Sequence, residues 1–341
     1  MAHFIDSDCN YEVEYTATEA AGLHERRRLC IKNPRHVNFH PIGTLAITSL
    51  PEVFQTKEVF NAIKVIADLT VRIRSEYTSM SRPATLPESS RAYAGAELRG
   101  CSAVRFGTGF IGKVRLVKNS DNLQGRSSSC PCFICKSPKN IPCEDWGEIS
   151  IITAAHVLCT PDELVHSEVD CFYDDDDNDA NVKILYGNSM RASENSISKV
   201  SFSDDYCQFS VITHDIELCE KLGQHTIYDL VSMDLGFQPT TKTSITIIVS
   251  HPHGLTKCVS WGDRTSSDIL DPEAPVKHRY RYSTPTCPGS SGALVWVLEN
   301  LQNKWQKVYV HSAGLSSGFN ISGSVDVFGE FISSDVPCHI S

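Results

Sequence analysis

Long apolar runs are missing from this chain of 341 residues. No stretch of about 18 uncharged apolar residues occurs, so we predict no membrane-spanning helix and no membrane partner. Residues 1–8 lack the basic start and the apolar core of a secretory signal peptide. We therefore expect a cytoplasmic protein.

An excess of positive charge is missing as well. The chain has 31 Lys and Arg against 41 Asp and Glu, a net charge of −10, whereas nucleic-acid binders normally carry the opposite sign. We expect no nucleic-acid partner, and nothing in the sequence indicates an oligomeric state. Hydrophobic residues make up 41% and charged residues 21%, which excludes collagen-like, coiled-coil and wholly disordered chains.

The length allows one large unit or several smaller ones. Residues 1–98 form a predicted N-terminal extension. Within it, apolar residues recur at helical spacing over about 56–69, with Thr56 as a candidate N-cap, and residues 79–99 have the composition of a linker. After Gly100, short apolar or alternating runs are separated by turn residues, which favours an all-β sandwich or barrels over alternating βαβ units.

Three short strings carry candidate chemistry. Residues 151–157 form an apolar strand that ends in small residues and His156. Asp205 enters another strand-like run, and Ser291 stands in a glycine-flanked turn before a third. Singly, each has a bland explanation, because a histidine at a strand end is usually just hydrogen-bonded and a serine between glycines usually marks a turn.

Together the three residues supply what nucleophilic acyl transfer needs. A serine hydroxyl is a weak nucleophile until an imidazole takes its proton, a carboxylate must hold that imidazole, and backbone N–H groups must receive the oxyanion. Gly289 allows a bend that points its own N–H and that of Ser291 at one spot. The order His156, Asp205, Ser291 leaves room for a barrel between each pair.

These strings resemble those of a known family, the trypsin-like serine peptidases. The resemblance lies in Thr-Ala-Ala-His at 153–156 and Gly-x-Ser-Gly at 289–292, in the family's order, and in Gly-Thr-Gly-Phe at 107–110. The stretches 251–254 and 259–262 are similar to the opening of the second barrel in the HtrA-like and glutamyl-endopeptidase branches. The resemblance implies two packed six-stranded antiparallel β-barrels with the active site between them, over residues 99–220 and 221–341.

The resemblance also implies roles for single residues. His156 is the general base, Asp205 orients it, and Ser291 is the nucleophile of a serine endopeptidase that acts on proteins or peptides through an acyl-enzyme. The N–H groups of Gly289 and Ser291 form the oxyanion hole, Asp204 is the fallback for Asp205, and catalysis needs no cofactor. The alternative is a catalytically inactive scaffold of this fold that acts as a protein-binding module.

Some features depart from trypsin itself. No activation junction of the Arg/Lys-Ile-Val-Gly-Gly type exists, and Ser290 stands where trypsin-type enzymes keep an aspartate for the new N-terminal amine. We therefore predict an active geometry that does not wait for zymogen cleavage. Cys287 has the family's position, but residues 314–323 hold no cysteine to pair with it.

The residues of the main specificity pocket can be placed by the same resemblance. Pro285 takes the place of the pocket floor, so a Lys or Arg side chain would be buried there without a partner. Thr286 and His311 fill the places that glutamyl endopeptidases and viral chymotrypsin-like main proteases use, with Ser312 and Gly314 on the substrate-pairing edge. Because both side chains can donate to a carboxylate or amide oxygen, we predict cleavage after Glu or Gln. An ordinary, internally satisfied barrel histidine at 311 is equally open.

The 14 cysteines include one cluster. Cys130, Cys132, Cys135 and Cys143 lie close together, and the Cys-x-x-Cys pair has the spacing of a zinc knuckle, so we predict a structural zinc site. Free surface thiols or one disulfide are the alternatives. The others are interpreted as free thiols that behave as small hydrophobic residues: Cys9, Cys30, Cys101, Cys159, Cys171, Cys207, Cys219, Cys258, Cys287 and Cys338.

Overall fold

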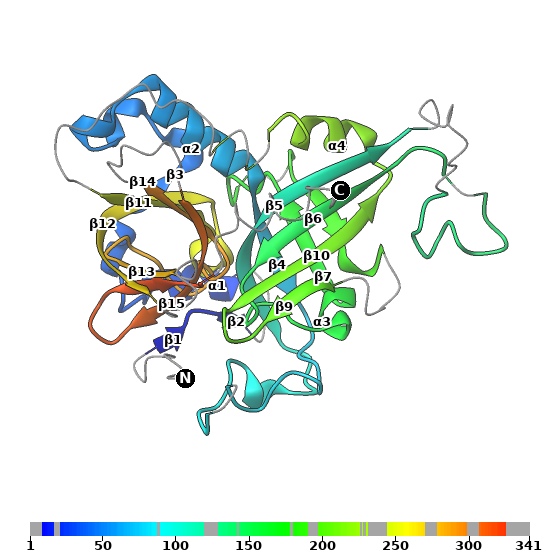
Figure 1. Cartoon of the computed structure of the whole chain (residues 1–341), viewed down its shortest axis with the longest axis horizontal. Coiled ribbons are helices and arrows are strands. Elements are labelled where there is room, and N and C mark those ends of the chain that lie inside the picture. Colours follow the sequence, from blue (N-terminus) through cyan, green and yellow to red (C-terminus); the bar gives the residue numbers. More distant parts are fainter. Residues whose placement is uncertain are drawn as a thin grey trace, which may run out of the picture.

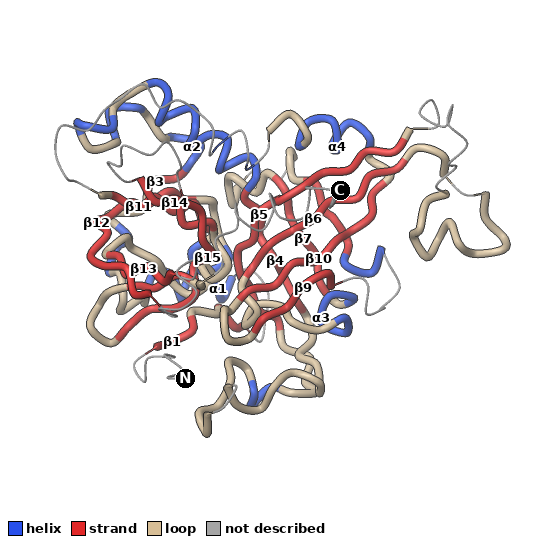
Figure 2. The backbone as a smooth tube through the Cα atoms, in the orientation of Figure 1, coloured by secondary structure: helices blue, strands red, loops and turns tan. Residues whose placement is uncertain are grey.

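Two antiparallel β-sheets lie side by side and form the framework of the protein (Figure 1), with short helices and loops around them (Figure 2). The computed structural model describes residues 9–16, 21–86, 89–118, 129–141, 143–177, 180–189, 197–225, 227, 230, 244–269, 278–298 and 307–324. The α-helices are α1 (Ala21–Arg28), α2 (Lys57–Leu69), α3 (Pro161–Val165) and α4 (Ile216–Leu222). Within these ranges no helix is long and apolar enough to cross a membrane.

The second half of the chain forms a closed antiparallel barrel, seen on the left of Figure 1. Pairing runs from β15 through β14, β11, β12 and β13 to β16, and a further pairing of β16 with β15 closes the ring. The strands are β11 (Ile245–Ser250), β12 (Cys258–Ile269), β13 (His278–Tyr282), β14 (Leu294–Leu298), β15 (Lys307–Leu315) and β16 (Asn320–Ser322).

The first half of the chain forms a curled antiparallel sheet in the order β8-β7-β4-β5-β6-β10-β9. Its strands are β4 (Thr70–Ser75), β5 (Val104–Val117), β6 (Trp146–Thr153), β7 (Ser167–Cys171), β8 (Lys183–Tyr186), β9 (Ile197–Ser201) and β10 (Tyr206–Thr213). The predicted all-β class with two packed antiparallel units is confirmed. One detail differs: in the described residues no pairing joins β8 to β9, so this sheet is a half-barrel rather than a closed six-stranded ring.

One apolar core runs through both sheets. Side chains from β6 and β10, among them Ile151 and Phe209, belong to the same buried cluster as Ile247 of β11 and Trp296 of β14. Burying an apolar side chain of this size contributes about 1.5–3 kcal/mol. The shared core therefore holds the two sheets, and the residues at their strand ends, in a fixed relation.

Helix α2 forms where the periodicity predicts it. The side chain of Thr56 accepts a hydrogen bond from the N–H of Val59 at 3.2 Å, which caps the first turn. The buried face of the helix, including Val59, Ile63 and Ile66, joins the common core, and the chain passes directly into β4. The predicted amphipathic helix is confirmed.

Strands from the N-terminal part of the chain pair with strands of both sheets. Strand β1 (Cys9–Tyr11) pairs with β15, β2 (Glu14–Thr16) with β5, and β3 (His40–Pro41) with β12. Strand β4 lies between β5 and β7. A boundary at residue 98 would leave β4 outside the first sheet, whereas the structure places it inside, because its apolar residues Val71 and Ile73 are buried there.

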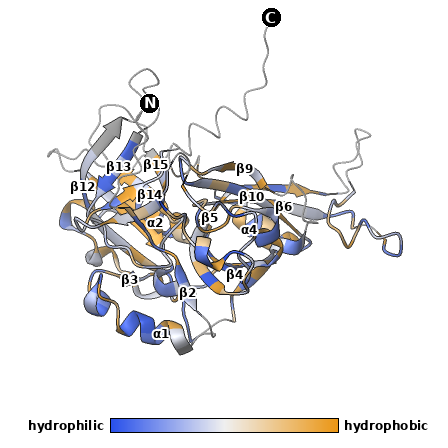
Figure 3. Ribbon diagram, turned by 90° about the horizontal axis from the view of Figure 1, so that it is seen from below, coloured by the Kyte–Doolittle hydropathy of each residue, from blue (hydrophilic) through white to orange (hydrophobic). Residues whose placement is uncertain are grey.

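Helix α1 lies on the outside of the molecule, and Figure 3 shows its hydrophilic character. Its inward residue Leu23 is buried against Phe106 of β5 and Leu255, which follows the 3-10 turn η9 (Pro252–Gly254). This contact fixes the loop after α1, which carries Cys30, Lys32 and His36, against the second barrel. The other 3-10 turns are η1 (Pro34–His36), η2 (Ile42–Thr44), η3 (Ile47–Ser49), η4 (Glu52–Phe54), η5 (Ala96–Leu98) and η7 (Gly187–Ser189).

Candidate active site

His156 and Asp205 meet because β6 and β10 are antiparallel neighbours, with Thr153 opposite Cys207. Nδ1 of His156 lies 2.7 Å from Oδ2 and 2.9 Å from Oδ1 of Asp205, and the backbone N–H of His156 donates to Oδ1 at 3.1 Å. Both side chains are buried. This network assigns the proton to Nδ1 and leaves Nε2 as an acceptor.

The carboxylate of Asp205 is held in its ionised form. Burial raises its pKa, but His156 and the hydroxyl of Ser312, which donates to Oδ2 at 2.5 Å, outweigh burial, so the pKa lies below its usual value. Asp204, the fallback of the sequence prediction, points elsewhere and accepts a hydrogen bond from Ser201 at 2.7 Å. Asp205 is thus the aspartate that faces His156.

Ser291 lies in the turn between β13 and β14, packed against the end of β6. Its carbonyl accepts from the N–H of Thr108 at 2.8 Å, and Thr153 donates to the Thr108 carbonyl at 2.7 Å. In the described part of the chain, Oγ of Ser291 and Nε2 of His156 are buried and have no hydrogen-bond partner. These are the two atoms that would exchange a proton in a serine peptidase.

Gly289, one of the two residues of the predicted oxyanion hole, has a left-handed backbone conformation. Its φ is +93°, and a Cβ there would lie 2.6 Å from the carbonyl oxygen of His251 and 2.7 Å from the nitrogen of Gly254. Only glycine fits this position.

The cleft between the sheets contains a segment of the chain itself. Upstream, β1 pairs antiparallel with β15, with Asn10 opposite Gly314. Downstream, β2 pairs with β5. Between them, the carbonyl oxygen of Glu12 accepts a hydrogen bond from the N–H of Gly289 at 2.9 Å, and the ring of Tyr11 lies 4.5 Å from that of His156 between centroids.

The carboxylate of Glu12 enters the predicted specificity pocket. Its Oε2 accepts from Oγ1 of Thr286 at 2.7 Å and from Nε2 of His311 at 3.1 Å, while Nζ of Lys32 contacts Oε1. Because an ionised carboxylate only accepts hydrogen bonds, Nε2 of His311 carries the N–H toward Glu12, while Nδ1 lies 2.7 Å from the hydroxyl of Tyr282. Burial raises the pKa of Glu12, but His311 and Lys32 lower it to about 2.

Comparison with known proteins gives remote likenesses. No protein-family model and no curated protein matches the chain. Among solved structures, the chain is similar to the Rv3671c protease of M. tuberculosis in its active form, with 13% identity over 84% of this chain and 90% of that chain and a TM-score of 0.39. It is also similar to the inactive form of Rv3671c protease, with 12% identity over 81% and 93% and a TM-score of 0.40. These structural neighbours are proteases.

The structure brings several of the predicted site residues together. His156 contacts Asp205, and Thr286 and His311 share the carboxylate of Glu12. The N–H of Gly289 donates to the carbonyl of the same glutamate, and Ser291 lies buried in the same turn as Gly289. Ser312 supports Asp205 with its side chain, while its neighbours in β15 pair with β1. The catalytic roles of these residues stay predictions.

Sequence reasoning missed two residues of the site, Glu12 and Lys32. Nothing in the local sequence marks either of them, because Lys32 meets Thr286 and Asn320 only through the fold, at 2.9 and 2.8 Å. To find Glu12 from the sequence, the glutamates near the N-terminus would have to be tested as substrates of the predicted Glu/Gln specificity.

A buried ion cluster supports the loop that carries His156. Arg82 binds Glu163 through two hydrogen bonds of 2.7 and 2.9 Å, and Arg105 approaches the same carboxylate at 3.1 Å. Arg82 also donates to the carbonyl of His156 at 2.8 Å, and Arg105 to that of Val157 at 3.0 Å. The region predicted as a linker thus contributes a buried anchor, Arg82.

Three of the four predicted cysteines gather around a histidine that the sequence analysis did not name. The sulfurs of Cys130, Cys132 and Cys135 lie 3.2, 3.8 and 3.6 Å from Nε2 of His214, which follows β10. The backbone N–H of Cys143 donates to the sulfur of Cys135 at 3.3 Å. Among the described residues, Cys130, Cys132, Cys135 and His214 are the group here that could hold a metal ion, because the end of β10 meets the cysteine loop. We name these four residues the Cys130 cluster.

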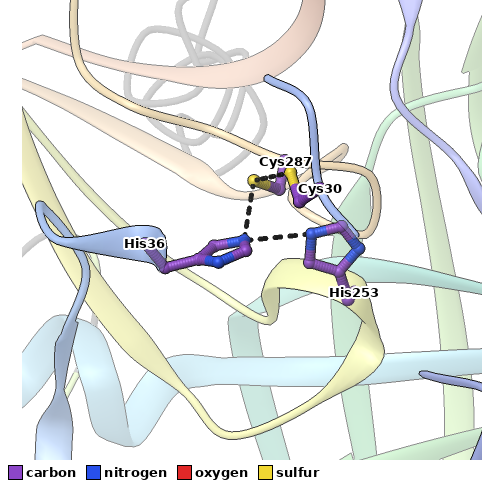
Figure 4. A group of neighbouring side chains, drawn as sticks. All are labelled: Cys30, His36, His253 and Cys287. Atoms are coloured by element: carbon purple, nitrogen blue, oxygen red, sulfur yellow. Dashed lines mark hydrogen bonds between the residues drawn. The ribbon is translucent and has the colours of Figure 1, made fainter. Parts of the chain in front are cut away.

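The remaining cysteines are partly as predicted. All described cysteines are free, and Cys338 lies outside the described residues. Cys30 and Cys287, however, do not stand singly, because they form a second group of four possible metal ligands with His36 and His253 (Figure 4).

Proposed function

We propose that the protein is a serine endopeptidase that hydrolyses peptide bonds on the carboxyl side of glutamate. One observation carries this proposal: a peptide segment lies in the cleft, with a glutamate carboxylate on Thr286, His311 and Lys32 and the adjoining carbonyl oxygen on the N–H of Gly289. These are the contacts that acyl transfer to a nearby serine needs.

The chemistry follows from the arrangement of the buried groups. Nε2 of His156 takes the proton of the Ser291 hydroxyl as Oγ attacks the carbonyl carbon. The N–H of Gly289 stabilises the oxyanion, and His156 returns the proton to the leaving amine. A water molecule then hydrolyses the acyl-enzyme by the same steps in reverse, while Asp205 stabilises the imidazolium.

Three donors in the pocket favour glutamate over glutamine. Thr286 and His311 can donate to either side chain. The ammonium of Lys32 adds a hydrogen bond that is stronger to the charged carboxylate of glutamate than to the neutral amide of glutamine. A Lys or Arg side chain would bring a second cation beside Lys32 and lose water without gaining a partner.

A fluorophosphonate probe and a peptide library test the proposal. We expect the probe to label the wild type but not Ser291→Ala, and we expect cleavage after Glu with a kcat about 10⁴-fold or more lower in Ser291→Ala. Wild type that neither reacts nor cleaves would favour the binding module, and cleavage after Lys, Arg, Phe or Leu would contradict the pocket assignment.

We further propose that the Cys130 cluster binds a structural zinc ion. Tetrahedral zinc with ordinary bond lengths places sulfur and nitrogen ligands about 3.6 Å apart, close to the three distances to His214. The N–H of Cys135 donates to the sulfur of Cys132 at 3.3 Å, as suits a thiolate in a Cys-x-x-Cys knuckle. Metal analysis should show one zinc fewer per chain in Cys132→Ser but not in the exposed control Cys101→Ser. Equal zinc content in the two variants would contradict this assignment.

A further inference from the structure

We propose that the protein cleaves its own chain between Glu12 and Val13, an inference that rests on the peptidase function proposed above. The segment that carries this bond is not merely close to the cleft. It has the extended form and the register of a bound peptide.

Upstream of the bond, the segment extends the second barrel. Tyr11, Asn10 and Cys9 face Ala313, Gly314 and Leu315 in antiparallel register. This is the part of β15 that the sequence predicts as the substrate-pairing edge. Strand addition of this kind gives main-chain hydrogen bonds to a peptide whatever its side chains are.

Downstream of the bond, the segment changes sheets. Glu14 faces Phe106 of β5 in the first sheet, and Thr16 faces Val104. The two pairings leave only Glu12 and Val13 between the sheets. The peptide bond between these two residues therefore crosses from one sheet to the other. It lies beside Gly289 of the Ser291 turn, and Tyr11, one residue before Glu12, has its ring 4.5 Å from that of His156.

The pocket selects which bond is presented. The carboxylate of Glu12 lies in the pocket, whereas that of Glu14 is bound by His253 at 2.7 Å and by Arg26 at 3.0 Å. Glu12 is thus the glutamate of this segment whose carbonyl oxygen also meets the N–H of Gly289.

The docked segment also closes the site. Ser291 and His156 are fully buried, and Tyr11 lies over the imidazole of His156. No other peptide can pair with β15 while β1 occupies it. Cleavage and departure of the upstream part would open the site, so self-cleavage precedes the cleavage of other substrates. This agrees with a geometry that does not wait for zymogen cleavage, because the intact chain already holds the contacts to Glu12 and blocks only the access of other peptides.

The reaction balances with water as the one co-reactant. Oγ of Ser291 bonds to the carbonyl carbon of Glu12, and its proton passes to Nε2 of His156. The C–N bond breaks as His156 gives that proton to the nitrogen of Val13. Water then attacks the ester, its proton passes through His156 back to Oγ of Ser291, and the products are a Glu12 carboxylate and a Val13 amine.

Intact mass and N-terminal sequencing of the full chain test self-cleavage. We expect the wild type to begin at Val13 after incubation, while Ser291→Ala and Glu12→Lys retain the residues before it. The matched control Glu25→Lys, at an exposed glutamate of α1, should be cleaved as the wild type is. Wild type that keeps Glu12 joined to Val13 would overturn the proposal.

A peptide with the sequence of residues 8–16 separates this proposal from the peptidase function. Suppose that the Glu12→Lys variant cuts the peptide after Glu, while the wild-type chain keeps its own bond between Glu12 and Val13. The segment is then an inhibitor: the self-cleavage proposal is wrong and the proposed peptidase function is supported. If no variant cuts the peptide or reacts with a fluorophosphonate, both proposals fail.

A different observation carries a second inference, independent of the first. We infer that Cys30, His36, His253 and Cys287, here the Cys30 cluster, bind a zinc ion (Figure 4). Their ligand atoms all lie within 4.8 Å of one another and come from the loop after α1, η9 and the Ser291 turn. Two thiols and two imidazoles are a common ligand set of tetrahedral zinc.

The distances match the edges of a zinc tetrahedron. The sulfurs of Cys30 and Cys287 are 3.6 Å apart and Nε2 of His36 and His253 are 3.1 Å apart, while Nε2 of His36 lies 3.4 Å from the sulfur of Cys287. Ordinary zinc bond lengths give edges of about 3.7 Å for two sulfurs and about 3.3 Å for two nitrogens.

The surroundings orient the ligands as metal sites require. Nδ1–H of His253 donates to Glu14 at 2.7 Å, which leaves Nε2 free to bind metal. The side-chain amide of Asn33 donates to the sulfur of Cys287 at 3.2 Å, and its backbone N–H to that of Cys30 at 3.5 Å. Donors to both sulfurs favour thiolates.

The backbone supplies further support. Non-glycine residues with positive φ are uncommon, and three of the five in the described residues lie at this cluster: Arg35 at +63°, His36 at +53° and His253 at +59°. Such strain costs about 1–3 kcal/mol per residue and persists where other interactions compensate it. Zinc coordination supplies that compensation.

Cys287 is a free cysteine without a disulfide, and the zinc site would anchor it instead. It ties the turn that carries Gly289 to the loop after α1, and the N–H of His253 donates to the carbonyl of Pro288 at 2.5 Å. Zinc at the Cys30 cluster would therefore hold the oxyanion turn in place, as a positioning device rather than a catalytic ion.

Zinc content in a Cys132→Ser background tests the inference, since that change removes the Cys130 cluster as a site. We expect Cys30→Ser in this background to lose one zinc per chain, and Cys258→Ser, a buried neighbour that is no ligand, to lose none. If Cys30→Ser does not fold, cobalt in the unaltered Cys30 cluster should give the absorption of a two-thiolate tetrahedral site. Equal zinc with and without Cys30, or an intact mass that shows a Cys30–Cys287 disulfide, would overturn the inference.

Discussion

At the scale of single residues, Lys32 adds a positive charge to the two donors of the proposed pocket, Thr286 and His311. Thr286 and His311 follow from motif positions, because each lies at a fixed place relative to the Ser291 turn and β15. Lys32 and Glu12 do not, because their contacts join parts of the chain that are far apart in sequence. A short sequence motif predicts site residues that lie on one strand or turn. Residues that reach the site from distant parts of the chain become visible only in the folded structure.

Lys32→Met should narrow the preference for glutamate over glutamine. Loss of a hydrogen bond to a charged group costs about 1.5–3 kcal/mol, so we expect kcat/KM for a Glu peptide to fall at least about tenfold and that for the Gln peptide to change little. Paired peptides that differ only in Glu or Gln measure the ratio. The exposed control Lys57→Met should leave it unchanged, and an unaltered ratio in Lys32→Met would show that the ammonium does not read the substrate.

At the scale of elements, a buried ion cluster of Arg82, Arg105 and Glu163 holds the loop after β6. Arg82 lies in a stretch whose composition predicts a linker, and composition does not reveal that one arginine of a Ser- and Pro-rich segment is completely buried. Helix α2, in contrast, follows from its sequence alone, since its cap and its buried face lie within one short stretch. His214 escaped prediction for the same reason as Arg82: it joins the Cys130 cluster only through the end of β10.

Glu163→Gln should destabilise the protein strongly. Removing one partner of a buried ion pair costs about 3–5 kcal/mol, and urea unfolding at pH 7 would measure it. Burial raises the pKa of Glu163, but Arg105 and Arg82 outweigh burial and lower it below 4.5. The carboxylate therefore stabilises the fold above about pH 4.5 and loses this effect as the pH falls through its lower folded pKa, so the gap between wild type and variant should shrink in acid.

The matched control for this prediction is Glu220→Gln. Glu220 forms an exposed pair with Lys118, and such pairs contribute about 0–1 kcal/mol. An equal loss of stability in both variants would contradict a special role of the buried cluster.

At the scale of the whole molecule, residues 9–16 join the two sheets across the cleft. The all-β class and the two-unit plan follow from the spacing of apolar runs and from the motifs of residues 107–110, 153–156 and 289–292. The path of residues 9–16 cannot be predicted in this way, because short strands such as β1 and β2 acquire their conformation from the strands with which they pair. The open edge of the first sheet and the place of β4 likewise depend on pairing partners rather than on local pattern.

In a Ser291→Ala background, where the segment stays intact, Glu12→Lys should lower the Tm by at least about 3 °C, because a second cation replaces the carboxylate beside Lys32. Glu12 has a pKa of about 2 against an ordinary 4.5, so its contribution is complete above about pH 4.5 and disappears toward pH 2. Calorimetry at pH 7, 4 and 3 should show the two Tm values converging. Glu25→Lys in the same background is the control, and a constant gap between pH 7 and 3 would contradict the role of Glu12.

The pairing of β1 with β15 has a consequence for solubility. Residues 313–315 have β1 on one side and, through 313 and 314, β16 on the other. Removal of β1 would leave a row of unpaired backbone donors and acceptors on β15, and an uncovered strand edge of this kind is a template for association with other chains. Strand β1 thus covers a strand edge that would otherwise be open to other chains, and a chain cleaved after Glu12 that has lost the upstream part would expose this edge.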